Sequence, residues 1–82
     1  MQEKAKKAVL DYYVKKGITL DLDNIFVVWF CKTLQNWKCI LASTNKDQLF
    51  FEVTYNGNEK EMYVDVYDKK ENIVVREEKD NE

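Results

Sequence analysis

Histidine is missing from this chain of 82 residues, and glycine occurs only twice. Without histidine, the commonest general acid–base group of enzymes is absent, and Ser–His and Cys–His nucleophile pairs are excluded. The two glycines, Gly17 and Gly57, stand where a helix end and a turn are expected, so the chain has no glycine-rich loop for a phosphate. We therefore expect a protein that is not an enzyme.

Cysteine is also scarce, because Cys31 and Cys39 are the only two in the chain. If Gln35 and Asn36 form a two-residue turn, the two thiols project from opposite faces of a hairpin, since neighbouring strand residues alternate. Bridging them would need a slipped register. We expect two reduced thiols packed as small hydrophobes, with a disulfide or a metal site as the alternative. Zinc lacks ligands in a chain with two thiols and no histidine, and we expect no cofactor.

Neither sign of charge dominates, and no apolar run is long. The 13 basic and 15 acidic residues give a net charge of −2, which offers no attraction toward duplex DNA or an anionic membrane. No apolar segment reaches the roughly 18 residues that span a bilayer. The basic N-terminus leads into an amphipathic pattern without a secretory apolar core. We expect a cytoplasmic protein without a membrane partner.

Two groups of acidic residues could be taken for a calcium site and a catalytic carboxylate pair, and both have a simpler explanation. Asp21, Asp23 and Asn24 resemble part of a calcium loop but lack its glycine and terminal glutamate, so we expect a loop or capping role. A carboxylate pair for acid–base chemistry can be drawn from Glu52, Glu61 and Asp65. Carboxylates on the solvent side of a sheet are usually just solvated.

The segment from Gln2 to Lys16 predicts an amphipathic helix. Gly17 follows it at the position where a left-handed residue ends a helix, and Ile18 can supply the accompanying apolar contact. Because the apolar arc is wide, we expect the helix to touch more than one surface, and then a loop or short extended edge over residues 19–24. On a helical wheel the arc contains Ala5, Ala8, Val9, Tyr12 and Tyr13, widened by Leu10 and Val14.

The run from Ile25 to Leu41 predicts a β-hairpin closed at Gln35-Asn36, whose first strand is apolar on both faces. A strand of this kind must be covered on both sides, and little of the chain is left to do so. The pattern therefore indicates a partner, including a second copy of the chain. One face of this hairpin is expected to collect Phe26, Val28, Phe30, Leu34, Trp37, Cys39 and Leu41.

A second hairpin is predicted at Asn56-Gly57, because both central residues of a type I′ turn need positive φ. With that turn, Val53 opposes Lys60 and Phe51 opposes Met62. A middle turn at residues 45–47 joins the two hairpins, and each hairpin gives one apolar face that the helix can cover. In the second hairpin this face collects Leu49, Phe51, Val53, Met62, Val64 and Val66.

Together these elements predict an α+β fold, with the N-terminal helix packed on one face of a four- to five-stranded antiparallel meander sheet. The fifth strand would be the short apolar run at residues 73–75, added to the edge. We expect one domain at residues 1–75 and a charged, frayed tail at residues 76–82.

The other face of the predicted sheet mixes large aromatics with carboxylates and a lysine, and no element remains to cover it. An apolar patch rimmed by charge is typical of an interaction surface. Alternatively, the C-terminal segment folds back over this face, or the face is merely solvated. Trp29 and Tyr67 are the expected anchors, and Val27 is expected on the same face. The predicted interaction face comprises Trp29, Lys38, Ile40, Phe50, Glu52, Tyr63, Asp65 and Tyr67.

Several segments carry a resemblance to a known family. The chain resembles small uncharacterised proteins encoded by phages and prophages of Gram-positive bacteria in the stretches Val27–Lys38 and Phe51–Gly57, and then in Tyr63, Asp65, Tyr67 and Glu71-Asn72. The resemblance covers about residues 9–73 and is most distinctive in the first hairpin. It implies a phage origin and a bacterial cytoplasmic setting, and it carries over no activity and no functional residues.

From these patterns we expect a small phage accessory protein that binds another protein, as a homodimer, and modulates a host or phage factor. The alternative is single-stranded nucleic acid, since aromatics on an open sheet can stack unpaired bases. The carboxylates on the same face repel phosphate and count against it. A protein that imitates DNA would need a larger negative excess. The stacking candidates are Trp29, Phe50, Tyr63 and Tyr67.

Overall fold

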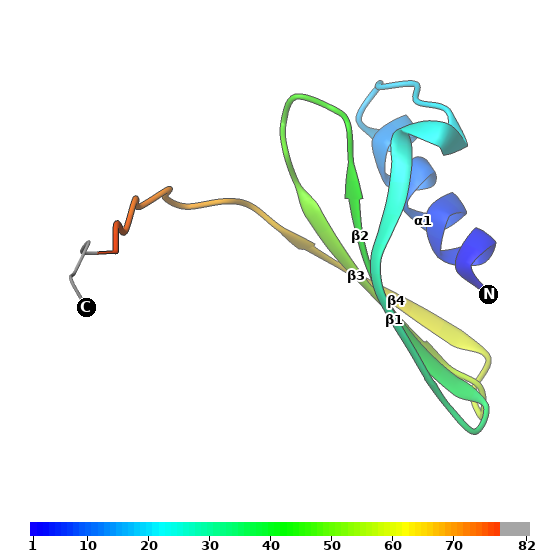
Figure 1. Cartoon of the computed structure of the whole chain (residues 1–82). Helices are drawn as coiled ribbons and strands as arrows, with labels where there is room; N and C mark the ends of the chain where they lie inside the picture. The colour runs from blue at the N-terminus through cyan, green and yellow to red at the C-terminus, as the bar shows by residue number, and fades with distance from the viewer. Residues whose placement is uncertain (78–82) are drawn as a thin grey trace.

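The computed structural model describes residues 1–77 and shows one helix against one side of a twisted four-stranded sheet (Figure 1). The four strands are antiparallel and follow one another in the order β1-β2-β3-β4, which confirms the predicted α+β meander with an N-terminal helix. A short 3-10 helix, η1 (Leu22–Asn24), precedes the first strand. The other elements are α1 (Gln2–Lys15), β1 (Ile25–Thr33), β2 (Asn36–Ser43), β3 (Phe50–Asn56) and β4 (Glu61–Tyr67).

The helix α1 ends as the sequence predicts. Gly17 has a φ of +80°, a conformation that glycine adopts without steric cost. Its backbone N–H donates to the Val14 carbonyl, and the Ile18 N–H donates to the Tyr13 carbonyl, both at 2.9 Å. These two hydrogen bonds form a Schellman motif. Ile18 packs partly buried against the core, which is the apolar contact expected of it.

The core lies between α1 and the sheet. The helix contributes Ala5, Val9 and Tyr13, each fully buried. Val14 is 61% exposed, so the prediction of an arc that touches several surfaces is wrong at this residue, and α1 lies against one side of the sheet. Full burial of a valine, leucine, isoleucine or phenylalanine side chain contributes about 1.5–3 kcal/mol. The sheet residues that join them in this core are Ile25, Trp37, Cys39, Leu41, Phe51 and Val53.

A buried hydroxyl ties the helix to the far end of the sheet. The Tyr13 hydroxyl lies 2.9 Å from the Ser43 hydroxyl and donates a 3.0 Å hydrogen bond to the Asp47 carboxylate. Burial raises the pKa of Tyr13, and the neighbouring Asp47 adds to this effect. The contact joins α1, the end of β2 and the β2–β3 loop, which lies where the middle turn was predicted.

The capping role expected in the segment before β1 is present. The backbone N–H of Asp21 donates to the Asn24 side-chain oxygen at 2.8 Å. The amide nitrogen of Asn24 donates in turn to the Thr44 hydroxyl at 3.1 Å. These residues therefore connect η1 to the end of β2.

The first hairpin turns one residue earlier than predicted. Leu34 and Gln35 form the turn, and Thr33 pairs with Asn36. Leu34 has a φ of +56° and is 82% exposed, so its predicted place on the covered face is wrong. The physical reason lies in Asn36, whose side-chain oxygen accepts the Gly57 N–H at 2.9 Å from a position within β2.

The two thiols lie on opposite faces, as predicted. Shifting the turn by one residue moves the partner of each strand residue by two positions, so every side chain stays on the same face of the sheet. Cys31 pairs with Lys38 and is exposed, whereas Cys39 pairs with Phe30 and is buried. Both cysteines are free. Burial raises the pKa of the Cys39 thiol.

A β-bulge between Val27 and Trp29 reverses the faces of the first half of β1. One extra residue, Val28, has no partner on β2. The side chains before it in β1 therefore point to the opposite faces from those expected by counting back from the turn. Ile25 and Val27 therefore face α1, and Phe26 faces the other side, where it pairs with Ala42. The predictions that Phe26 and Val28 lie on the covered face, and Val27 on the open one, are wrong.

The second hairpin has a four-residue loop at residues 57–60 in place of the predicted two-residue turn. Asn56 pairs with Glu61, and Val53 with Val64, so the predicted register is wrong. Positive φ is found at Lys60 (+55°) and not at Gly57. The shift preserves parity, and the predicted apolar face of this hairpin is right.

A glycine is needed at position 57 because the backbone there packs closely against Gln35. A Cβ atom at Gly57 would collide with the carbonyl oxygen and side chain of Gln35, so the tip of the second hairpin lies against the tip of the first (Figure 1). The Gln35 amide donates a further hydrogen bond to the Asn58 side chain. The wider loop is explained by this contact between neighbouring hairpins.

The C-terminal segment adds no strand. Residues 68–77 have neither helix nor strand and are exposed, and Figure 1 shows them leading away from the sheet. The predicted strand at 73–75 is therefore wrong; its three apolar side chains are at least 69% exposed. Of the predicted tail at 76–82, residues 78–82 lie outside the described residues. No helix among residues 1–77 is long and apolar enough to cross a membrane.

Candidate functional site

The side of the sheet opposite α1, called here the open face, is organised in rows by the strand register. Each row takes one residue from each strand, and all eight residues of the predicted interaction face lie in three adjacent rows. The rows are Phe26, Ala42, Phe50 and Tyr67; Trp29, Ile40, Glu52 and Asp65; and Cys31, Lys38, Thr54 and Tyr63.

Large aromatic side chains on this face are about half exposed. No segment among residues 1–77 covers them, and the chain after β4 leads away (Figure 1), so the alternative in which the C-terminal segment folds back over the face is wrong for the described residues. Aromatics dominate the energetics of interfaces because each buries a large area. The exposed fractions are 47% for Phe26 and Trp29, 50% for Phe50, 51% for Tyr63 and 53% for Tyr67.

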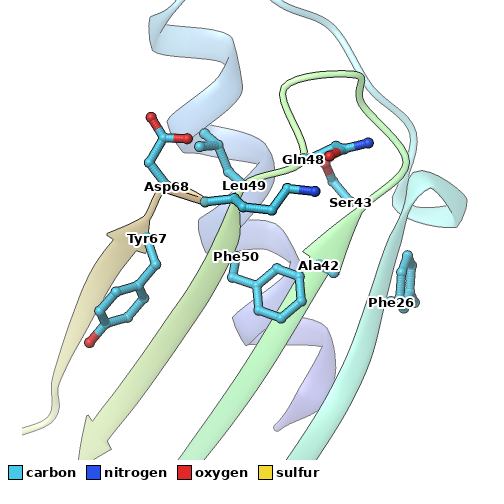
Figure 2. A pocket seen from close by; sticks show the side chains of 9 residues that line it. Phe26, Ala42, Ser43, Gln48, Leu49, Phe50, Tyr67 and Asp68 are labelled. Carbon is cyan, nitrogen blue, oxygen red and sulfur yellow. The ribbon is translucent and has the colours of Figure 1, made fainter. Parts of the chain in front are cut away.

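The first row is hollowed at its centre. Ala42 is small and lies between Phe26 and Phe50, and Figure 2 shows these three side chains with Tyr67 on the near side of the sheet and α1 behind it. The result is an open cavity of about 560 Å³, which we call the Ala42 hollow. It is lined by Phe26, Ala42, Ser43, Gln48, Leu49, Phe50, Tyr67, Asp68 and Lys69.

A polar connection crosses three strands next to the hollow. The Lys38 ammonium lies 3.2 Å from one Glu52 carboxylate oxygen, and the Tyr67 hydroxyl donates a 2.9 Å hydrogen bond to the other. The hydrogen bond from Tyr67 lowers the pKa of Glu52, and Lys38 adds to this effect. The same bond raises the pKa of Tyr67. Phe50 and Tyr67 are held side by side as a rim of the hollow.

Negative charge remains on the rest of the face. The Tyr63 hydroxyl donates to the Glu61 carboxylate, which raises the pKa of Tyr63. Asp65 stands directly opposite Glu52 in the register and has no ion-pair partner among residues 1–77. Like charges directly opposite one another are unfavourable. A basic group of a partner placed near Asp65 would reduce this repulsion.

The open face combines exposed aromatic area with a few polar groups at the surface. Within residues 1–77, no three acidic or thiol side chains gather as metal ligands do. On the open face the carboxylates of Glu52 and Glu61 are already joined to tyrosine hydroxyls, and Glu52 also to the Lys38 ammonium. Asp65 has no ion-pair partner among residues 1–77. What is available to a partner is the exposed aromatic area and the Ala42 hollow.

Sequence reasoning missed Phe26 as part of this site. The predicted register puts Phe26 on the covered face, but the bulge turns it to the open face, where it forms one wall of the hollow. The six residues 25–30 are all apolar, so they show no alternation that could reveal which side chains face the helix. Their faces can be assigned only by counting residues back from the turn, and the bulge makes that assignment wrong for the residues before it.

A family model described as a family of unknown function (DUF6275) matches residues 2–77. The chain belongs to this family. The match covers α1, all four strands and the segment after β4, so the whole open face of this DUF6275 member lies within it. The comparison with curated proteins gave no match, and neither did the comparison with solved structures. The family description assigns no activity.

Proposed function

We propose that this protein acts without catalysis, by binding another protein through the open face, with the Ala42 hollow as the anchor site. The observation that carries the proposal is the half-exposed aromatic row around a cavity of about 560 Å³. Ligand cavities are typically of about 300–1,000 Å³. Because this one is open and continues into an aromatic face of three rows, an anchor side chain with further contacts around it suits it better than an enclosed small molecule.

The charges on the face indicate the chemistry of the partner. Lys38 is already engaged by Glu52, so Asp65 and Glu61 leave an acidic surplus beside the aromatics. A segment that presents a large apolar side chain to the hollow and a basic side chain toward Asp65 would satisfy both features. Interfaces of this kind have an apolar centre and a polar rim.

The setting that we propose rests on the resemblance of the sequence. We place the protein in the cytoplasm of a bacterial cell, as a phage or prophage accessory protein that modulates a host or phage factor. The resemblance in the first hairpin and in β3 supports this placement. No small-molecule cofactor or metal enters the proposal.

The test compares two single substitutions of exposed apolar residues on different sides of the molecule. Phe50→Asp alters the rim of the hollow, and Val14→Asp alters the outer side of α1, where the side chain is 61% exposed. Proteins captured from a bacterial host by the immobilised wild-type chain should be lost with Phe50→Asp and retained with Val14→Asp. The captured protein, once purified, should bind the wild-type chain in calorimetry. Equal capture by both variants would contradict the proposal.

Single-stranded nucleic acid is the alternative that the exposed aromatics favour. Binding of an oligonucleotide should then weaken steeply as salt rises, and Trp29→Ala should reduce it because stacking contributes about 1–3 kcal/mol per base. The carboxylates of Glu61 and Asp65 oppose phosphate on this face. We therefore expect no binding at low or high salt, and salt-sensitive binding that requires Trp29 would replace the protein-binding proposal.

A further inference from the structure

β4 is an open edge of the sheet. It pairs only with β3, so its other side carries backbone N–H and C=O groups that no strand among residues 1–77 satisfies. Such an edge is a template for pairing with another chain unless something blocks it. The opposite edge, β1, is interrupted by its bulge between Val27 and Trp29. β4 keeps an unbroken register with β3 over its seven residues and contains neither proline nor lysine.

The helix side of β4 is apolar and uncovered. Met62, Val64 and Val66 pair with β3 residues that face α1, yet each remains 37–38% exposed. The helix contributes its buried side chains to a core that includes β1, β2 and β3 but no residue of β4. The prediction that α1 covers this part of the apolar face is therefore wrong. A strip of three apolar side chains along an open edge is suited to a strand that carries the same strip.

We propose that β4 pairs antiparallel with β4 of a second copy of the chain, with Val64 on the two-fold axis. In this register Met62 lies opposite the partner's Val66, and Val64 lies opposite itself, so the helix side becomes one apolar strip. All seven residues of β4 are paired. The two copies form one continuous eight-stranded sheet, with both helices on one side and both open faces on the other.

The charges of β4 select this register over its neighbours. With Val64 on the axis, Tyr63 lies opposite the partner's Asp65 and Glu61 opposite the partner's Tyr67, so every carboxylate meets a tyrosine. Centring the pair on Asp65 sets that carboxylate against its own copy. Centring it on Tyr63 sets Glu61 against the partner's Asp65. Like charges directly opposite each other destabilise a strand pair, so both shifted registers are unfavourable.

The residues beyond the strand ends agree with the same register. Counting onward from Tyr67 brings Asp68 toward the partner's Lys60, and Lys69 toward the partner's Glu59. Both pairs have opposite charges. The exposed segment that begins at residue 68 leads away from its own sheet in Figure 1, which leaves it available to run along the β3–β4 loop of the partner.

This inference goes beyond the proposed function and does not depend on it. Self-association through β4 uses the strand edge and the helix side of the sheet, and leaves Trp29, Phe50 and the Ala42 hollow accessible in both copies. Phe50→Asp should therefore abolish capture of another protein and leave the dimer intact. Failure of one proposal can thus be told from failure of the other.

The test is a register-specific disulfide in the full-length chain, with Cys31→Ser as the background so that the exposed native thiol cannot react. Directly opposed residues of an antiparallel pair lie about 4.5–5.5 Å apart between Cα atoms, which suits a disulfide. V64C should form a covalent dimer on mild oxidation. M62C alone and V66C alone should not, whereas an equimolar mixture of M62C and V66C should. The Cys31→Ser parent is the control that stays uncrosslinked.

A second measurement does not depend on oxidation. Sedimentation equilibrium of the wild-type chain should show a dimer of 9.8 kDa subunits. Tyr63→Glu, which would face the partner's Asp65, should raise the dissociation constant at least tenfold relative to Tyr63→Lys, since the lysine faces the same carboxylate with opposite charge. A monomer at every concentration, or cross-linking of M62C alone as efficient as that of V64C, would overturn the inference.

Discussion

The Tyr67 hydroxyl of β4 donates a 2.9 Å hydrogen bond to the Glu52 carboxylate of β3, on the face of the sheet that α1 leaves uncovered. Lys38 of β2 holds the other oxygen of the same carboxylate. Three strands are thereby joined by side chains on the open face, next to the Ala42 hollow. The orientation of Tyr67 as one wall of that hollow depends on this carboxylate.

Replacing Tyr67 with phenylalanine should raise the pKa of Glu52, because the hydrogen bond from Tyr67 is the largest influence that lowers it. Carboxyl carbon NMR titration of both proteins measures the change. Since the pKa of Glu52 is lower in the folded state, this group stabilises the protein above the ordinary glutamate pKa, and the contribution is lost as the pH falls through the folded-state pKa. Tyr63→Phe is the matched control, because Tyr63 donates to Glu61 instead. An unchanged Glu52 titration in Tyr67→Phe would contradict the contact.

Replacing Tyr13 with phenylalanine should lower the free energy of unfolding by about 1–2 kcal/mol, because the buried hydroxyl interacts with Ser43 and Asp47. Urea denaturation measures the difference. Tyr12→Phe is the control: the Tyr12 ring also packs against Phe51, but its hydroxyl makes no hydrogen bond within residues 1–77. Equal losses in the two variants would contradict a specific contribution of the Tyr13 hydrogen bonds.

Alkaline pH should lower the free energy of unfolding of the wild-type protein through ionisation of Tyr13. Burial raises the pKa of Tyr13 in the folded state, so its contribution to stability is fully present below the ordinary tyrosine pKa and is lost as the pH rises through the folded-state pKa. Unfolding free energies measured across this range should fall more steeply for the wild type than for Tyr13→Phe. Parallel curves would mean that Tyr13 does not govern the alkaline loss.

Gly57→Ala should destabilise the protein by about 1–3 kcal/mol, the usual cost of inserting a methyl group where there is no space. The added Cβ would collide with Gln35 at the neighbouring hairpin tip. Amide NMR shifts should change at residues 34–36 as well as at the mutated loop. Gly17→Ala is the comparison, because nothing lies within 4 Å of a Cβ there and only the positive φ is strained; its shifts should stay near the end of α1. A Gly57→Ala protein unchanged at residues 34–36 would refute the contact.

The two tryptophans should respond differently to a quencher in solution. Trp37 is buried, with 5% exposed, and Trp29 is 47% exposed. In Trp37→Phe, the remaining Trp29 should emit at longer wavelength and be quenched readily by acrylamide. In Trp29→Phe, the remaining Trp37 should emit at shorter wavelength and be protected. Similar quenching of the two variants would mean that Trp29 is covered.

The two thiols should also react at different rates. Cys31 is exposed and should be modified rapidly by a thiol reagent in the native protein. Cys39 is buried, which raises its thiol pKa and so reduces the reactive thiolate. A time course should show one fast and one slow reaction, and Cys31→Ser should remove the fast one. Fast modification of Cys39 would contradict its place in the core.

Side-chain alternation made the covered and open faces of β2, β3 and β4 predictable, even though both turns were misplaced. An error in a turn that shifts the pairing by an even number of residues leaves every side chain on the same face of the sheet. Phe51 and Val53 are therefore buried as predicted, and Phe50 and Glu52 lie on the open face. The end of α1 was predictable for a local reason as well, since Gly17 alone permits the left-handed conformation there.

The sequence by itself determined the element order, the helix end and the apolar sides of β2, β3 and β4, because these depend on residues close together along the chain. Only the tertiary structure decided the bulge at Val28, the loop at Gly57 and the exposure of Val64. The bulge lies in an unbroken apolar run, the loop depends on space beside Gln35, and the exposed strip depends on how far one helix reaches across four strands. Each is a consequence of contacts between segments distant in the chain, and for that reason Phe26 joined the open face only when the strands were in place.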